Sequence, residues 1–329
     1  MRVAMLGGTG FIGRAIVASL ESAGHTVLVI HRGEHELPVP TGAEHAHLDR
    51  HDIAALAKAL DQFRPDALVD GFALTARDAD DVLLAVPGAL RMVVLSSMDV
   101  YRAFGALHAD TESDPMPLDE SSPVRTERYP FRGKHPKMHD YEKLDVEDRY
   151  LWRGATILRL PMVYGEHDPQ RREEPVLRRI RAGRTRLPVG PGNWLWSRAY
   201  VGEIGRAVQL AVECDAAAGE IINLSEARTS TMRAWFEQIV AAAGPSVELV
   251  TVPDTLLPPD LGLTGPIRQH LLFNPAKALS LLGWVHADPA ETVPPSVRWH
   301  LEHPPEKPDS DFSADDAALA AAVEPDPIA

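Results

Sequence analysis

The residues of this 329-residue sequence that point most directly to chemistry are three glycines after its first apolar run. Gly7, Gly10 and Gly13 separate the strand-like run Arg2–Leu6 from a stretch with a helical pattern. The first glycine permits a tight turn, the second lets a pyrophosphate approach backbone N–H groups, and the third lets the helix lie close to the sheet. Because the pattern stands between a strand and a helix, we expect a dinucleotide site, with a plain glycine-rich turn as the alternative. The residues expected to contact the dinucleotide are Gly7, Thr9, Gly10, Phe11, Ile12 and Gly13.

Arg32 stands at the end of the second apolar run, where a carboxylate would bind the ribose 2′-OH of NAD. This position holds no carboxylate, and a guanidinium can hold a 2′-phosphate instead. We therefore expect NADP in preference to NAD, with a solvated turn arginine as the alternative. Asp49 lies where a third strand should end and is a candidate acceptor for the adenine amino group.

Short apolar runs alternate with helical patterns through the first half of the chain. This alternation predicts parallel strands, right-handed crossovers and an α/β fold with a doubly wound parallel sheet, the Rossmann fold. The expected strands are Arg2–Leu6, Thr26–Ile30, Ala67–Val69, Met92–Leu95 and Thr156–Leu160. The expected helices include Phe11–Ala23, Ile53–Phe63, Asp78–Val86, His139–Trp152 and Met232–Ala243.

The pattern loosens after residue 165, which predicts a second, smaller lobe. We expect residues 1–165 to form the dinucleotide-binding core, with 199–225 returning to it. Residues 166–198 and 226–302 should form the C-terminal substrate-binding lobe. Residues 303–329 are acidic and rich in Pro and Ala, and this composition predicts a mobile tail with one helical turn around Asp315–Val323.

The overall composition argues against several classes of protein. The formal net charge of −14 opposes nucleic-acid binding, which needs basic surface to neutralise phosphates. One cysteine, Cys214, excludes an internal disulfide framework and a multi-cysteine metal site, and the histidines show no convincing ligand set, so we expect no metal. No run reaches the roughly 18 apolar residues of a membrane span. We expect a cytoplasmic protein without a membrane anchor.

Six motifs together resemble the NAD(P)-dependent epimerase/dehydratase family, the extended short-chain dehydrogenase/reductases, over roughly residues 1–300. The motifs are GGTGFIG (Gly7–Gly13), VVLSSMDVYR (Val93–Arg102), YEKLDVE (Tyr141–Glu147), LRLPMVYG (Leu158–Gly165), WSRAYVGEI (Trp196–Ile204) and LLGW (Leu281–Trp284). The resemblance implies hydride transfer with a nicotinamide cofactor, a small-molecule substrate and a homodimer.

The resemblance assigns roles to residues near the ends of two strands. Ser97 matches the serine that binds a substrate oxygen, with a capping serine as the alternative. Asp99 stands where many relatives have a small residue or threonine; it is a candidate catalytic group, or a carboxylate bonded to nearby backbone. Tyr101 is a candidate substrate contact, and Pro161 would shape the backbone beside the nicotinamide or simply end a strand.

The expected acid–base pair departs from the family's Y-x-x-x-K spacing. Lys143 matches the lysine that supports the tyrosine and binds the nicotinamide ribose, but His139 stands four residues before it. Tyr141 is two residues from Lys143, roughly 200° around an ideal helix. Three interpretations stay open: Tyr141 donates the proton from an irregular helix start, as in a Y-x-K branch of the family; His139 has taken that role; or the redox chemistry is lost.

The second lobe holds candidate substrate contacts. Seven arginines lie between Arg171 and Arg186, and they predict either a clamp for an anionic substrate or a solvated helix face or subunit contact. Trp196 stands where nucleotide-sugar enzymes of the family usually carry a diphosphate-binding arginine. Arg198, two residues on, would share its face in an extended segment and could substitute.

Two functions follow from these residues. The first is an NAD(P)-dependent oxidoreductase or epimerase acting on a hydroxyl or ketone carbon of a small, sugar-like or anionic substrate. The second is a redox-inactive family member with a nucleotide-binding or regulatory role; some chloroplast relatives bind RNA, which the acidic charge opposes here.

Overall fold

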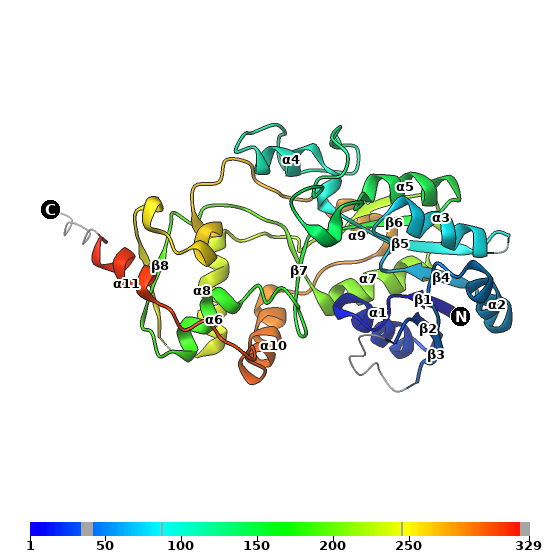
Figure 1. Ribbon diagram of the computed structural model, residues 1–329, viewed down its shortest axis with the longest axis horizontal. Coiled ribbons are helices and arrows are strands. Elements are labelled where there is room, and N and C mark those ends of the chain that lie inside the picture. The colour runs from blue at the N-terminus through cyan, green and yellow to red at the C-terminus, as the bar shows by residue number, and fades with distance from the viewer. Residues whose placement is uncertain (34–41, 87, 245, 323–329) are drawn as a thin grey trace.

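A seven-stranded parallel sheet forms the centre of the larger of two lobes (Figure 1). The computed structural model describes residues 1–33, 42–86, 88–244 and 246–322. The strand order is β10-β6-β5-β4-β1-β2-β3, and every recorded pairing in the sheet is parallel. The strands are β1 Arg2–Leu6, β2 Thr26–His31, β3 Glu44–His47, β4 Ala67–Asp70, β5 Arg91–Ser97, β6 Thr156–Leu160 and β10 Ile221–Asn223. This confirms the predicted doubly wound α/β fold.

Helices cover both faces of the sheet, as Figure 1 shows. One face packs against α1 Phe11–Ser22, α7 Val201–Glu213 and α9 Ala276–Leu282. The other packs against α2 Ile53–Phe63, α3 Ala76–Ala85 and α5 Lys143–Trp152. Because both faces are covered, the central strands are continuous apolar runs: all five residues of β6 are buried.

The smaller lobe has its own apolar core, centred on Trp194, Trp235 and Phe236. It contains two short parallel pairs, β11 with β8 and β7 with β9. Their bounds are β7 Met162–Tyr164, β8 Arg186–Val189, β9 Arg198–Tyr200 and β11 Glu248–Thr251. The helices are α4 Arg102–His108, α6 Glu174–Arg181, α8 Met232–Ala243, α10 Pro289–Glu302 and α11 Ser313–Ala320. Short 3₁₀ helices are η1 Met98–Val100, η2 Pro136–Met138, η3 Asp215–Ala217, η4 Asp254–Leu256 and η5 Pro259–Thr264.

The division between the lobes differs from the expectation at two places. Helix α9 and Trp284, expected in the smaller lobe, pack against α7 and the sheet. Val100, Tyr101 and Leu118, expected in the larger lobe, lie in the core of the smaller one. Apolar patterning predicted that these segments would be buried, but it contains no information on which core receives them.

The prediction of a helix over His139–Trp152 is wrong at its start, because α5 begins at Lys143. Glu142 is the N-cap: its backbone is extended and its side chain accepts a hydrogen bond from the N–H of Leu144. The carboxylate of Glu142 is also held by the guanidinium of Arg125, with N–O distances of 2.6 and 2.8 Å. This buried ion pair fixes the helix start, so that Tyr141 lies outside the helix.

Residues 303–322 of the expected tail end in α11, which overlaps the helical turn expected around Asp315–Val323; the mobility of the tail stays a prediction. Asp315 is 1% exposed and accepts hydrogen bonds from Arg179, which is itself fully buried. A buried charge needs a partner, so this pair ties the segment to α6. Residues 323–329 lie outside the described part. No helix within the described ranges has the length and apolar character needed to cross a membrane.

Candidate functional site

The glycine turn between β1 and α1 has the geometry of an anion cradle. Gly7 has a positive φ of 83°, which favours glycine. A Cβ on Gly13 would lie 2.0 Å from the carbonyl oxygen of Gly7, so α1 can approach the turn only with glycine there. Gly10 is the N-cap of α1 and has no side-chain cap, and a Cβ at this position would meet no atom within 4 Å. The first N–H groups of α1 are thus open to a diphosphate at the positive helix end.

A cleft of about 620 Å³ opens above this turn at the carboxyl ends of the strands. Open α/β sheets bind their ligands at this edge. The expected contact residues that line the cleft are Gly7, Thr9, Gly10, Arg32, Asp49, His139 and Tyr141. Phe11 instead lines a separate groove beside α7, and Ile12 packs on the core of the sheet.

The far end of the cleft is built from polar residues that follow β2 and β3. Arg32 lies directly beyond β2, and Asp49 accepts a hydrogen bond from the N–H of His51 at 2.9 Å. His31 Nε2 lies 2.8 Å from Nδ1 of His45, and its ring packs on His47. No group of three metal-ligating side chains is arranged around an ion site in the part of the chain that the structure describes.

Ser97 is the last residue of β5 and Lys143 is the first residue of α5, and neither lines the cleft itself. The Lys143 ammonium is buried and donates to the carbonyl oxygens of Ala73 at 2.6 Å and Leu95 at 2.9 Å. Burial lowers its pKa, an effect that nearby carboxylates oppose. The Ser97 hydroxyl accepts a bond from the N–H of Asp99 at 3.3 Å and so caps η1. The Ser97 side chain also interacts by hydrogen bonding with the side chains of Asp99 and Tyr141.

The hydroxyl of Tyr141 points toward Asp99, not toward Lys143. It donates to Oδ2 of Asp99 at 2.5 Å, and both residues are buried. Burial raises the pKa of Tyr141 well above 10, and the negative charge of Asp99 raises it further. Burial also raises the pKa of Asp99, while the bond from Tyr141 lowers it. His139 lies outside this cluster: it is exposed, in the turn before the helix, and its ring pairs with Asp140.

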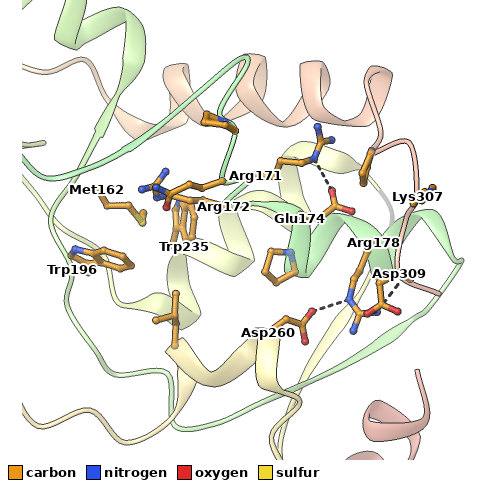
Figure 2. Close-up of a pocket in the computed structure, with 15 residues that line it drawn as sticks. Met162, Arg171, Arg172, Glu174, Arg178, Trp196, Trp235, Asp260, Lys307 and Asp309 are labelled. Carbon is orange, nitrogen blue, oxygen red and sulfur yellow. Dashed lines mark hydrogen bonds and ion pairs between the residues drawn. The ribbon is translucent and has the colours of Figure 1, made fainter. Parts of the chain in front are cut away.

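A second cavity of about 540 Å³ lies between Met162 and the C-terminal segment (Figure 2). Its inner end is formed by Met162, Trp196 and Trp235, which cluster on one side of Figure 2. Trp196 Nε1 lies 3.0 Å from the sulfur of Met98, the residue that follows Ser97. The apolar end is therefore adjacent to the end of β5.

The outer end of this cavity carries charged residues that already hold one another. Figure 2 shows Arg178 paired with Asp260 and Asp309. All seven arginines between Arg171 and Arg186 form ion pairs with carboxylates, so the expected anion clamp is largely neutralised. The pairs are Arg171–Glu174, Arg172–Asp168, Arg178–Asp260, Arg179–Asp315, Arg181–Glu174, Arg184–Asp316 and Arg186–Glu248.

Three expected contact residues are not brought to either cavity. Tyr101 is fully buried and its hydroxyl donates to the side-chain oxygen of Asn223 at 2.8 Å. Arg198 is 1% exposed, because Glu226 pairs with its guanidinium inside the lobe. Pro161 is buried between β6 and β7. Core partners thus already use the phenol of Tyr101 and the guanidinium of Arg198, and the roles of these two residues as substrate contacts stay predictions.

Three residues of the second cavity, Trp235, Met162 and Lys307, could not be identified from the sequence. Trp235 lies on an apolar helix face and Met162 in an apolar strand, so neither differs from core residues in pattern. Lys307 comes from a segment expected to be mobile. Only the motif around Met162, which follows the strand ending at Leu160, offered a signal.

The chain is similar in sequence or in fold to several known proteins. A 2′-dehydrokanamycin reductase of Streptomyces kanamyceticus is 27% identical to this chain. The matched region covers 77% of this chain and 70% of the reductase. A chloroplast stem-loop binding protein of Arabidopsis thaliana is 25% identical over 97% of this chain and 84% of its own. The structure of UDP-glucose 4-epimerase with UDP-glucose from Thermotoga maritima superposes with a TM-score of 0.68 at 18% identity, covering 92% of this chain and 99% of that one.

The family model described as the NAD dependent epimerase/dehydratase family matches residues 3–225. The matched range contains the glycine turn, Ser97, Tyr141 and Lys143. The chain therefore belongs to the NAD dependent epimerase/dehydratase family and is an enzyme of the extended short-chain dehydrogenase/reductase type.

Proposed function

We propose that this enzyme uses NADP(H), or less well NAD(H), to reduce or epimerise a ketone or hydroxyl carbon of a small, sugar-like substrate. The observation that carries the proposal is one cleft that joins the open N-terminus of α1 to Tyr141, with Lys143 and Ser97 adjacent. A relative named as a reductase and the family's dehydratases and epimerases support the same reaction class.

The residues of the cleft fit a dinucleotide. Gly10 leaves an open space beside the first N–H groups of α1, which suits a diphosphate. The Lys143 ammonium has three donors and uses two on backbone carbonyls, which leaves one for a ribose hydroxyl. Arg32 in the cleft wall supports a preference for the 2′-phosphate of NADP.

The catalytic roles follow from the side chains at the end of β5. The bound nicotinamide would supply or accept the hydride. Ser97 would donate a hydrogen bond to the reacting substrate oxygen, and Tyr141 would exchange a proton with that oxygen. Lys143, buried and cationic, would hold the cofactor ribose and stabilise negative charge near the phenol. His139 is exposed and paired with Asp140, which disfavours it as the proton donor.

The second cavity is the proposed substrate site. The indole faces of Trp196 and Trp235 and the side chain of Met162 suit the apolar face of a sugar-like ring. The arginines at the outer end are already paired, so we do not assign them as a diphosphate clamp. These arginines and their carboxylate partners would instead form hydrogen bonds with the hydroxyl groups of the substrate.

The exposed faces of helices α3 and α5 support a homodimer. Leu84 on α3 is 71% exposed and Trp152 on α5 is 85% exposed, and both line one shallow surface. Burial of such side chains against a second copy would remove apolar surface from water.

The test is the oxidation of NADPH and NADH with a panel of ketoses, keto-deoxysugars and simple ketones. We expect turnover with at least one carbonyl compound, and a loss of about 100-fold or more in kcat for Tyr141→Phe and Lys143→Met. His139→Ala should retain activity. Full activity in all three variants would contradict the assigned acid–base residues, and cofactor binding without any turnover would support the redox-inactive alternative.

A further inference from the structure

Tyr141 faces a carboxylate where the family's spacing would place it beside the lysine. Its hydroxyl lies 2.5 Å from Oδ2 of Asp99, whereas the ammonium of Lys143 is engaged by the carbonyl oxygens of Ala73 and Leu95. A distance of this size is typical of a strong O–H···O⁻ hydrogen bond. Asp99 therefore affects the proton of the Tyr141 hydroxyl more directly than Lys143 does.

The carboxylate of Asp99 has few other partners. Asp99 is 4% exposed, and Oδ1 has no hydrogen-bond partner among the residues that the structure describes. Arg125 donates to the backbone oxygens of Asp99 and Glu127 and to the carboxylate of Glu142, not to the carboxylate of Asp99. An ionised carboxylate this poorly satisfied is costly to bury, whereas a protonated one is not.

Charged and titratable groups face Asp99 and Tyr141 from each neighbouring element. Arg125 comes from the loop before α5, Lys143 from the first turn of α5, and His108 from the end of α4. The positive groups Arg125 and Lys143 favour the ionised form of Asp99, but burial is the largest influence and raises its pKa. Burial therefore favours the neutral form of Asp99, whereas the two positive groups and the hydrogen bond from Tyr141 favour the carboxylate.

We propose that Asp99 and Tyr141 act as one proton-delivering pair, in which Tyr141 protonates the substrate oxygen and Asp99 returns a proton to Tyr141. The inference rests on the proposed function and assigns Asp99 as a positioning and relay residue behind the phenol. It differs from an arrangement in which a lysine alone stabilises phenolate.

In the direction of reduction, the reduced cofactor gives a hydride to the carbonyl carbon and is thereby oxidised. A C–H bond forms, and the π electron pair of the C=O bond moves to the oxygen. That oxygen takes the proton of Tyr141, and the phenolate takes the proton of the neutral Asp99 carboxyl group. The products are an alcohol and the hydrogen-bonded Tyr141–Asp99 carboxylate pair; Asp99 regains a proton from water. Avoiding adjacent phenolate and carboxylate charges is the advantage of the relay.

The pair can be tested without substrate or cofactor by NMR of protein labelled with ¹³C at tyrosine Cζ. The Tyr141 signal is assigned as the one missing from Tyr141→Phe. In the wild type we expect this signal to shift as Asp99 titrates, at a higher pH than an ordinary aspartate, and to show phenolate only at a higher pH than an ordinary tyrosine. In Asp99→Asn the first shift should vanish and phenolate should form at lower pH than in the wild type, because no anion opposes it.

Asp145→Asn is the matched control, because Asp145 is a carboxylate of α5 that pairs with Arg128 and not with Tyr141. It should leave the Tyr141 signal unchanged. Identical Tyr141 titrations in wild type and Asp99→Asn would overturn the pair. If Asp99→Asn does not fold, the converse measurement uses Tyr141→Phe: its Asp99 C=O infrared band should persist to higher pH than in the wild type, and an unchanged band would overturn the pair.

The pH dependence of turnover distinguishes a failure of this inference from a failure of the proposed function. With any carbonyl compound that is turned over, reduction by the wild type should fall as pH rises through the titration of Asp99, and Asp99→Asn should lose that pH step. If the Tyr141 signal titrates as expected but no carbonyl compound is turned over, the proposed function is wrong and the Tyr141–Asp99 pair is not. If a compound is turned over and the pH dependence is the same in the wild type and in Asp99→Asn, the proton relay is wrong and the proposed function is not.

Discussion

The position of Tyr141 illustrates what residue spacing can and cannot predict. The Y-x-K spacing identified Tyr141, Lys143 and the irregular helix start as one of three interpretations. The decisive feature, the buried Arg125–Glu142 pair that starts α5 at Lys143, joins residues 17 apart through a loop. Sequence periodicity carries no information on such a pair. Asp99 was identified as unusual, but its contact with the phenol depends on the same loop.

At the cofactor end, Arg32 is the residue whose replacement should change cofactor choice. Loss of a charged hydrogen bond to a 2′-phosphate costs about 1.5–3 kcal/mol, or roughly 10-fold to 150-fold in Kd. We expect Arg32→Ala to weaken NADPH binding by that factor and to leave NADH binding nearly unchanged, as measured by calorimetric titration. Arg77→Ala, on the exposed face of α3, is the control. An equal loss of affinity for NADPH and NADH would show that Arg32 does not bind the 2′-phosphate.

At the scale of elements, most regular segments of the larger lobe followed from the sequence. The bounds predicted for Ile53–Phe63, Thr156–Leu160 and Met232–Ala243 are those observed. Local patterning succeeds there because each segment buries one apolar stripe or a whole apolar run. In the C-terminal segment, local patterning predicted one helical turn but not the contacts with Arg178 and Arg179, which lie more than a hundred positions earlier in the chain.

The order of the C-terminal segment gives a stability prediction. Asp315→Asn removes the more deeply buried of the two carboxylates that bind Arg179, the other being Asp260, and should lower the free energy of unfolding by about 1–3 kcal/mol. Asp316→Asn removes an exposed carboxylate paired with Arg184 and should cost less than about 1 kcal/mol. Urea unfolding followed by tryptophan fluorescence measures both. Equal effects of the two substitutions would mean that the segment is not held by Arg179.

At the scale of the whole molecule, the exposed apolar surface of α3 and α5 predicts self-association. We expect the wild type to sediment at twice the 36.0 kDa chain mass, and Leu84→Glu with Trp152→Glu to sediment as a monomer. Leu279→Glu is the control, since Leu279 is 54% exposed on α9, on the opposite face of the sheet. A monomeric wild type, or a double variant that remains dimeric, would contradict this interface.

The proposed function depends on the binding of a pyridine nucleotide by the turn that precedes α1. Calorimetric titration of the wild type, Gly10→Val and Gly105→Val with NADPH and NADH tests it most directly. Both glycines have room for a side chain, so both variants should fold, but only the side chain at Gly10 would fill the cradle. We predict one bound nucleotide per chain for the wild type and for Gly105→Val, and none for Gly10→Val. Failure of the wild type to bind either nucleotide, or undiminished binding by Gly10→Val, would contradict the proposed function.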